Sequence, residues 1–188
     1  MINQLKIIEL IISLESIIIA TMLPVYIFLP SKINFIQLVD IPITMQVPTI
    51  IFLTIIFSEK IVYKSYTIYI LIGLFFLPIF YDGGSLGYIL TPNFGYLLGI
   101  YPLIKIISEL YRLKQFSLKK FLRVSIIAIL IMHITGILFT SLQLLLFNKI
   151  NLIPYNIGKY TFSKIFYELL LLFPLLLLLK TFKKLRLY

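Results

Sequence analysis

Apolar residues come in long blocks along this chain, and short polar or turn-rich stretches separate them. A membrane-spanning helix needs about 20 mostly apolar residues to cross a hydrocarbon core roughly 30 Å thick. Six blocks come near that length, so the pattern predicts six transmembrane helices. They cover residues 7–29, 41–57, 61–80, 87–107, 124–147 and 162–180.

Two of these blocks contain prolines that modify the prediction. The second block is short and carries Pro42 and Pro48, so we expect part of it to enter as non-helical chain. The sixth block is a leucine-rich run with Pro174 in its middle, where we expect a kink.

Composition supports a membrane protein. Apolar residues make up 61% of the chain, charged residues 13%, and the mean hydropathy is +1.06. A soluble globule of this composition would expose large apolar patches. The expected fold class is therefore an all-α membrane protein. We expect one six-helix domain over residues 1–188, embedded in the lipid bilayer of the cell membrane as a multi-pass protein.

The distribution of positive charge predicts the orientation. With a cytoplasmic N-terminus, six crossings also place the C-terminus in the cytoplasm. All 17 Lys and Arg residues then fall inside except Lys32, Lys149, Lys159 and Lys164. This is the bias that cytoplasmic loops carry. The net charge of +10 is explained by this basic rim, so we do not expect a nucleic-acid partner.

Several chemistries are disfavoured by composition. The chain has no cysteine, and His133 is its only histidine, so thiolate and multi-histidine metal sites are not expected. Gly158-Lys159 lacks the Ser or Thr of a phosphate-binding loop, because Tyr160 follows it. We therefore expect no catalytic residues, no metal and no cofactor, and ATP hydrolysis would belong to another subunit.

Residues 77–99 form the most informative segment. It reads LPIFYDGGSLGYILTPNFGYLLG and holds Gly83, Gly84, Gly87, Gly95 and Gly99. Irregular backbone at membrane depth is tolerated only where it is buried in protein or lines a cavity. The segment is therefore a candidate binding site, and the predicted topology places it on the outer face.

Three short motifs, one before this segment and two in it, carry a family resemblance. They are Pro42-Ile43-Thr44-Met45-Gln46, Leu77-Pro78-Ile79-Phe80 with Gly83-Gly84, and Pro92-Asn93-Phe94-Gly95-Tyr96-Leu97-Leu98-Gly99. Their order and spacing resemble the signature of BioY proteins, the biotin-binding membrane subunits (S components) of energy-coupling-factor (ECF) vitamin transporters. The resemblance implies biotin as ligand and a coupling module made of a transmembrane scaffold subunit and two ATPase subunits.

The chain departs from this family pattern in two places. BioY proteins commonly carry Gly-Asp-x-x-Lys at the start of the last helix, but here Tyr167-Glu168 aligns with Gly-Asp and Leu171 stands in place of the lysine. Lys164 lies one turn before Glu168 and is our candidate for the missing cation. For docking to the scaffold, Ser16 and Ala20 are the small residues of the first helix with suitable spacing.

Biotin offers a ureido ring with two donors and one acceptor, an apolar bicycle and a carboxylate tail, so its pocket needs polar groups, rings and a cation. The expected substrate-binding residues are Gln46, Tyr81, Asp82, Gly83, Gly84, Asn93, Tyr96, Lys164 and Glu168.

Structural roles remain open for the same residues. Asp82 with its glycines suits a turn, the tyrosines suit an interfacial belt, and Gln46 and Asn93 suit local backbone bonding. Lys164 and Glu168 could form a rim pair. For His133 we expect a hydrogen bond between helices in preference to ligand contact.

Three other functions stay open. An S component for another vitamin is the nearest, given the altered motif on the last helix. An integral membrane enzyme acting on a lipid-like substrate would use His133 or Glu168 as base, but the sequence supplies no nucleophile or metal-ligand set beside them. A structural assembly subunit is the third.

Overall fold

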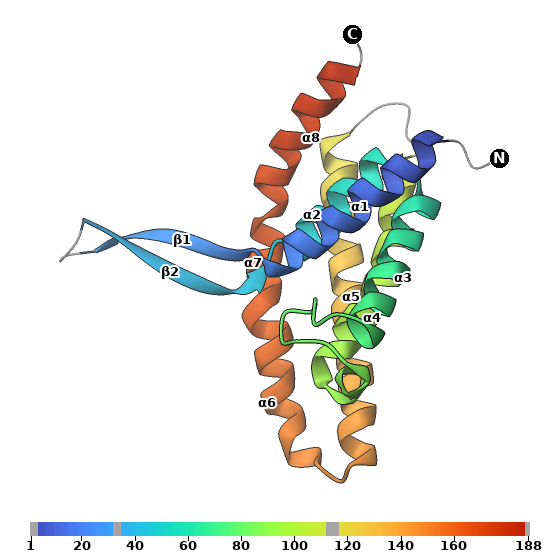
Figure 1. Ribbon diagram of the computed structural model, residues 1–188. Coiled ribbons are helices and arrows are strands. Elements are labelled where there is room, and N and C mark those ends of the chain that lie inside the picture. The colour runs from blue at the N-terminus through green and yellow to red at the C-terminus, as the bar shows by residue number, and fades with distance from the viewer. Residues whose placement is uncertain (1–3, 32–34, 112–116, 187–188) are drawn as a thin grey trace.

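The computed structural model describes residues 4–31, 35–111 and 117–186. Within these ranges the chain folds into a bundle of six helical rods with one β-hairpin attached (Figure 1). Five rods are single helices: α1 (Gln4–Met22), α2 (Gln46–Ile56), α3 (Glu59–Phe75), α4 (Pro92–Tyr111) and α5 (Leu118–Leu146). The sixth is built from α6 (Ile153–Ile157), a π-helical turn η3 (Gly158–Phe162), α7 (Ser163–Leu170) and α8 (Leu172–Arg186). The expectation of a six-helix fold is confirmed.

The hairpin is the main difference from the sequence prediction. The first helix ends at Met22 instead of residue 29, and the antiparallel strands β1 (Pro24–Ser31) and β2 (Phe35–Thr44) follow it. Pro24 explains the early end, because proline lacks an N–H and disfavours helix at the residue before it. The run after it is rich in β-branched and aromatic residues, which suit a strand. Apolar content alone did not separate this strand from a helix.

The second block behaves as its prolines indicated. Residues up to Thr44 are extended, and α2 begins only at Gln46. Val25, Ile41 and Ile43 are buried at the base of the hairpin and pack with Tyr167 and Leu171 of the sixth rod. The expected non-helical entry is therefore present, and it lies against the end of α7 in the sixth rod.

The sixth rod is interrupted where proline predicts a kink. The α7 and α8 helices are separated at Leu171, three residues before Pro174. Pro174 has no N–H to donate to the carbonyl of residue 170, so the helical ladder loses a bond at this point. The rod also begins earlier than residue 162, because Pro154 in its first turn is compatible with helix initiation.

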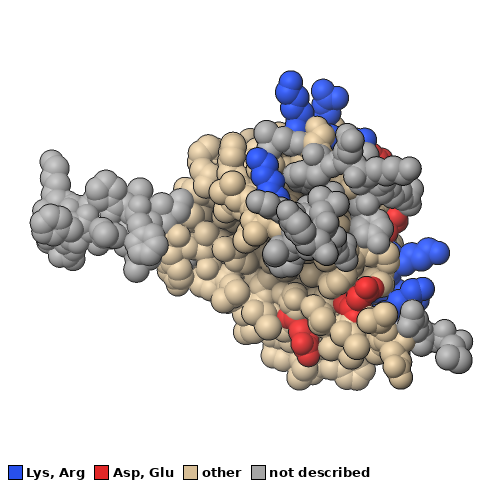
Figure 2. Space-filling view, turned by 90° about the horizontal axis from the view of Figure 1, so that it is seen from above, with Lys and Arg blue, Asp and Glu red and all other residues tan. Residues whose placement is uncertain are grey.

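Both ends of the described chain lie at the same end of the bundle, whereas the η1 turn (Leu86–Leu90) and the connection between α5 and α6 lie toward the other (Figure 1). Viewed from the end that holds the termini, Lys and Arg side chains stand along the upper and right edges, and Asp and Glu side chains also lie on this face (Figure 2). Lys32, Arg112 and Lys114, which contribute to the predicted charge bias, lie outside the described residues.

The core lies between the rods, whose helices pack closely against one another. Glycines let α4 and α5 approach, since a Cβ at Gly99 would meet the Met132 carbonyl oxygen at 2.5 Å. Tyr66 is fully buried on α3, and its hydroxyl donates to the Leu97 carbonyl of α4 at 2.7 Å. Within the described ranges, two helical stretches are long and apolar enough to cross a membrane, Lys119–Leu146 and Ile150–Thr181, and Gln46–Ile56 is a shorter apolar helix.

Candidate functional site

A cavity opens between the base of the hairpin, the start of α2, the first half of α4, the middle of α5 and the sixth rod. The space inside it that water-sized molecules can fill is about 70 Å³, and counting the open solvent at its mouth raises the value to about 650 Å³. It is lined by aromatic and apolar side chains and by a few polar groups, which is the usual character of a small-molecule site. Six of the nine predicted substrate-binding residues line it: Gln46, Tyr81, Asn93, Tyr96, Lys164 and Glu168.

The other three predicted residues build the turn beside the cavity and do not line it. Phe80 and Gly83 exchange two backbone hydrogen bonds of 2.8 and 3.0 Å around Tyr81 and Asp82. Gly83 has φ of 113°, a conformation that favours glycine. A Cβ on Gly84 would meet the Gly73 carbonyl oxygen at 2.6 Å, so Gly84 permits the turn to pack on the end of α3.

Asn93 links this turn to the cavity wall. Its side-chain nitrogen donates to the Tyr88 hydroxyl at 2.8 Å and to a carboxylate oxygen of Asp82 at 3.3 Å. In the described part of the chain its side-chain oxygen has no hydrogen-bonding partner. Because Asn93 lines the cavity, that oxygen is an acceptor available to a ligand.

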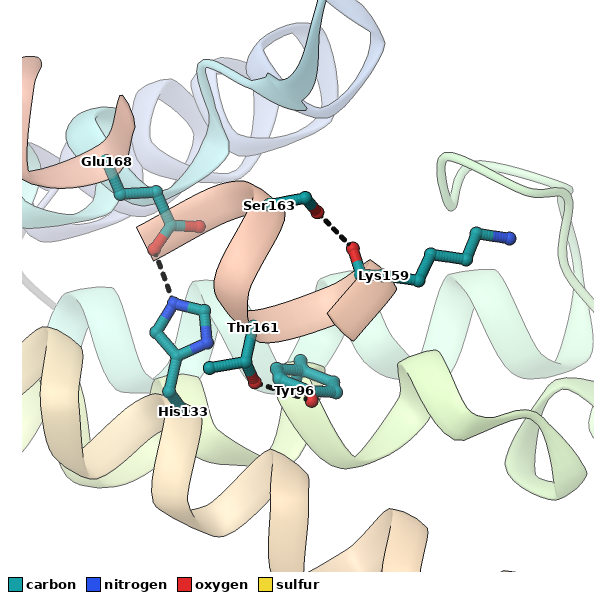
Figure 3. A network of polar contacts seen from close by, with 6 residues as sticks. All are labelled: Tyr96, His133, Lys159, Thr161, Ser163 and Glu168. Atoms are coloured by element: carbon teal, nitrogen blue, oxygen red, sulfur yellow. Dashed lines mark hydrogen bonds and ion pairs between the residues drawn. The ribbon is translucent and has the colours of Figure 1, made fainter. Parts of the chain in front are cut away.

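Another part of the wall depends on Tyr96. Its hydroxyl lies 2.8 Å from the Thr161 hydroxyl, which joins α4 to the π-helical turn η3 (Figure 3). A Cβ on Gly136 would meet the Tyr96 ring at 2.4 Å, so only glycine lets this ring lie against α5. The π-helical turn thus orients Thr161 toward Tyr96, and Gly136 provides the space for the ring.

A buried acid and the single histidine meet on the cavity wall. His133 of α5 is 2% exposed and Glu168 of α7 is 6% exposed, and Nε2 of His133 lies 2.8 Å from Oε2 of Glu168 (Figure 3). Since a carboxylate accepts, Nε2 carries the hydrogen of this bond. The prediction that His133 hydrogen-bonds between helices is confirmed. His133 also lines the cavity, as Glu168 does.

Two lysines approach one ring of the sixth rod. Nζ of Lys159 lies 5.0 Å and Nζ of Lys164 lies 5.4 Å from the centre of the Tyr160 ring. Tyr160 and Lys164 both line the cavity. The Tyr160, Tyr96 and His133 rings follow one another at centre-to-centre distances of 5.8 and 5.7 Å. One cavity wall thus runs from a cationic region to the His133–Glu168 pair.

Sequence reasoning missed part of the lining. Thr21 and Tyr69 contribute to the cavity, and the Thr21 hydroxyl donates to the Tyr69 hydroxyl at 3.2 Å. Neither belongs to a motif, and their polar positions on apolar helices were the available signal. Gln46 begins α2, and its side-chain nitrogen is buried without a hydrogen-bonding partner. The described residues contain no cluster of three or more metal-ligating side chains.

The proposed docking pair does not lie on an open surface. Ala20 is 3% exposed and packs inside the bundle, and Ser16 is partly buried. The exposed face of α1 instead carries Ile8, Ile12, Glu15 and Ile19. Residues 16 and 20 share the face of α1 that packs against α2 and α3, and their role in docking stays a prediction.

Comparison with known proteins decides the family. The BioY family matches residues 3–182. The chain belongs to the BioY family. A probable biotin transporter BioY from Lysinibacillus sphaericus is 30% identical over 98 residues, which cover 52% of this chain and 50% of that protein. The match to this curated relative thus spans about half of its length.

A solved structure supports the architecture. The S-component for biotin from an ECF-type ABC transporter, a crystal structure at 2.1 Å, superposes with a TM-score of 0.56 and 22% identity, covering 91% of this chain and 94% of that one. Family and fold together identify this chain as a membrane protein with the helical S-component fold.

Proposed function

We propose that this BioY-family chain captures biotin as the membrane-embedded, substrate-specific subunit of an ECF-type transporter. The observation that carries the proposal is the set of unused polar groups on one cavity. The Asn93 side-chain oxygen and the second carboxylate oxygen of Glu168 have no partner in the described residues, and the Gln46 side-chain nitrogen is a buried donor without one. Two acceptors and one donor complement the two N–H groups and the carbonyl of a ureido ring.

The same wall suggests how the ligand lies. A carboxylate tail would rest near Lys164 and Lys159, and the bicycle would lie along Tyr160 and Tyr96 toward Glu168. Enclosure is required for tight capture, because a nanomolar Kd corresponds to about −12 kcal/mol. A ligand of roughly sixteen heavy atoms reaches that value only when most of its surface is buried.

The assembly around this chain is also part of the proposal. The chain would cross the plasma membrane six times with both termini in the cytoplasm, next to the basic end of the bundle, so that the cavity receives biotin from outside. It would act as a binding subunit and not as an enzyme. A transmembrane scaffold subunit and two ATPase subunits would supply the energy, with the exposed face of α1 as the contact.

A binding assay on purified protein tests the proposal. The protein in detergent is incubated with radiolabelled biotin, and retention is measured against unlabelled biotin, biotin amide, thiamine and riboflavin as competitors. Saturable retention that biotin removes, and that the other vitamins do not, supports biotin capture. Retention displaced better by another vitamin favours an S component for that vitamin. No saturable retention at micromolar biotin contradicts binding.

A further inference from the structure

Lys164 and Glu168 have the spacing of an ion pair but do not form one. They lie four residues apart on α7, where side chains are neighbours on the helix surface. Both line the same cavity. Within the described ranges, the one hydrogen bond of the Glu168 side chain is with His133. Nζ of Lys164 instead lies 5.4 Å from the centre of the Tyr160 ring.

This separation needs a cause. On an exposed helix the order Lys before Glu gives a weak pair, but charges attract more strongly where water is excluded. Glu168 is buried, so its carboxylate would gain by turning toward the ammonium one turn away. His133 approaches from another helix, α5, and binds Oε2 at 2.8 Å. Figure 3 shows the imidazole beneath the carboxyl group, with Ser163 and then Lys159 to the right of Glu168.

We propose that His133 is a positioning residue that holds the Glu168 carboxylate away from the Lys164 ammonium. The cavity then keeps a hydrogen-bond acceptor and a cation separately available, as a ligand with both N–H donors and a carboxylate requires. Without the imidazole, Glu168 turns to Lys164 and the two groups satisfy each other. The role in ligand selection rests on the proposed function, but the separation itself does not.

Two variants of His133 distinguish the hydrogen bond from ring packing. His133→Phe keeps a ring against Tyr96, which the imidazole now meets edge-on at 5.7 Å, but it has no N–H. His133→Gln loses the ring and keeps a donor. A positioning role predicts that His133→Gln behaves like the unmodified protein and that His133→Phe does not. A packing role predicts that His133→Phe behaves like the unmodified protein and that His133→Gln does not.

The first test uses no ligand. Lysines of the detergent-purified protein are reductively methylated, and mass spectrometry follows Lys164 relative to the exposed Lys159. An ammonium bound to a carboxylate reacts slowly, so the Lys164 to Lys159 rate ratio should fall about 10-fold in His133→Phe and stay within about twofold in His133→Gln. Adding Glu168→Gln to His133→Phe should restore it. An unchanged ratio in His133→Phe overturns the proposal.

The second test uses biotin amide, which keeps the ureido ring but has no carboxylate for Lys164. His133→Phe should weaken its binding about 10-fold when Lys164 is present, and by no more than about twofold when Lys164→Gln is also present, because nothing then captures Glu168. An equal loss in both backgrounds overturns the proposal, since it indicates direct ligand contact or a packing defect. If His133→Phe does not fold, His133→Leu takes its place in both tests.

The outcomes separate the two proposals. Protein that binds no biotin contradicts the proposed function, yet the methylation ratio still decides whether His133 keeps the two charges apart. Normal biotin binding with an unchanged methylation ratio contradicts the positioning role alone.

Discussion

The side-chain nitrogen of Asn93 donates to the Tyr88 hydroxyl at 2.8 Å and so fixes the first turn of α4 beside the η1 turn. This bond uses the donor end of the amide of a residue that lines the cavity. The residue therefore has a structural bond and an unused acceptor at the same time.

Asn93→Ala should weaken biotin binding about 5- to 150-fold, because one ligand N–H loses its acceptor and each unmade buried bond costs about 1 to 3 kcal/mol. Equilibrium binding of radiolabelled biotin measures the change. Asn151→Ala, at an exposed position on the connection to the sixth rod, is the matched control and should leave the Kd unchanged. Equal affinities of the unmodified protein, Asn93→Ala and Asn151→Ala for biotin would show that Asn93 does not contact the ligand.

Glu168→Ala should weaken biotin binding by a similar factor, about 5- to 150-fold, and Glu168→Gln should lie between, since the amide keeps one acceptor but no charge. Glu109→Gln, at an exposed position on α4, controls for the change in net charge. Isothermal titration in detergent measures the three constants. Full affinity in Glu168→Ala contradicts the assignment of the ureido site.

Gly136→Ala should damage the cavity without touching a polar group. The added methyl would lie 2.4 Å from the Tyr96 ring, so the ring or the α4–α5 contact must shift. We expect a loss of affinity of about 10-fold or more, together with a lower melting temperature, from a strain of about 1 to 3 kcal/mol. Gly158→Ala is the control, because a Cβ there meets nothing within 4 Å. Indistinguishable behaviour of both variants contradicts the role of Gly136.

The exposed face of α1 should affect uptake and not capture. Ile12→Trp enlarges a side chain that is 45% exposed on this face, and Ile134→Trp does the same at a 54% exposed position on α5. Biotin binding by the isolated chain should stay the same in both. Uptake by cells that carry the coupling module should fall only with Ile12→Trp, and an equal fall with both would argue against α1 as the contact.

The helical architecture was accessible from sequence because apolar block length is a strong signal. The hairpin was not, because residues 24–29 prolong the first apolar block and the strand preference of their β-branched and aromatic residues is a weaker signal than block length. Pro24 was the residue in the sequence that indicated an earlier end of the first helix. The irregular entry before Gln46 was predictable, since Pro42 disfavours a regular helix there and Pro48 is compatible with the first turn of α2.

Cavity-lining residues that belong to short motifs could be predicted from the sequence, whereas those brought to the cavity by helix packing could not. Gln46, Asn93 and Tyr96 follow from short motifs, and the structure brings them to one cavity. Tyr69 and Thr21 reach it only because of how α1 and α3 pack, which spacing along the chain does not encode. The pairing of His133 with Glu168 joins residues 35 positions apart. Its existence was expected for His133, but its partner was not named.

An experimental structure of the protein saturated with biotin tests the central claim most directly. The account predicts the bicycle along Tyr160 and Tyr96, a ureido nitrogen within hydrogen-bonding distance of Glu168, and the carboxylate near Lys164. Biotin bound instead in the apolar groove between α2 and α8, which Pro48, Phe52 and Leu175 line, or an empty cavity at saturating biotin, would contradict it.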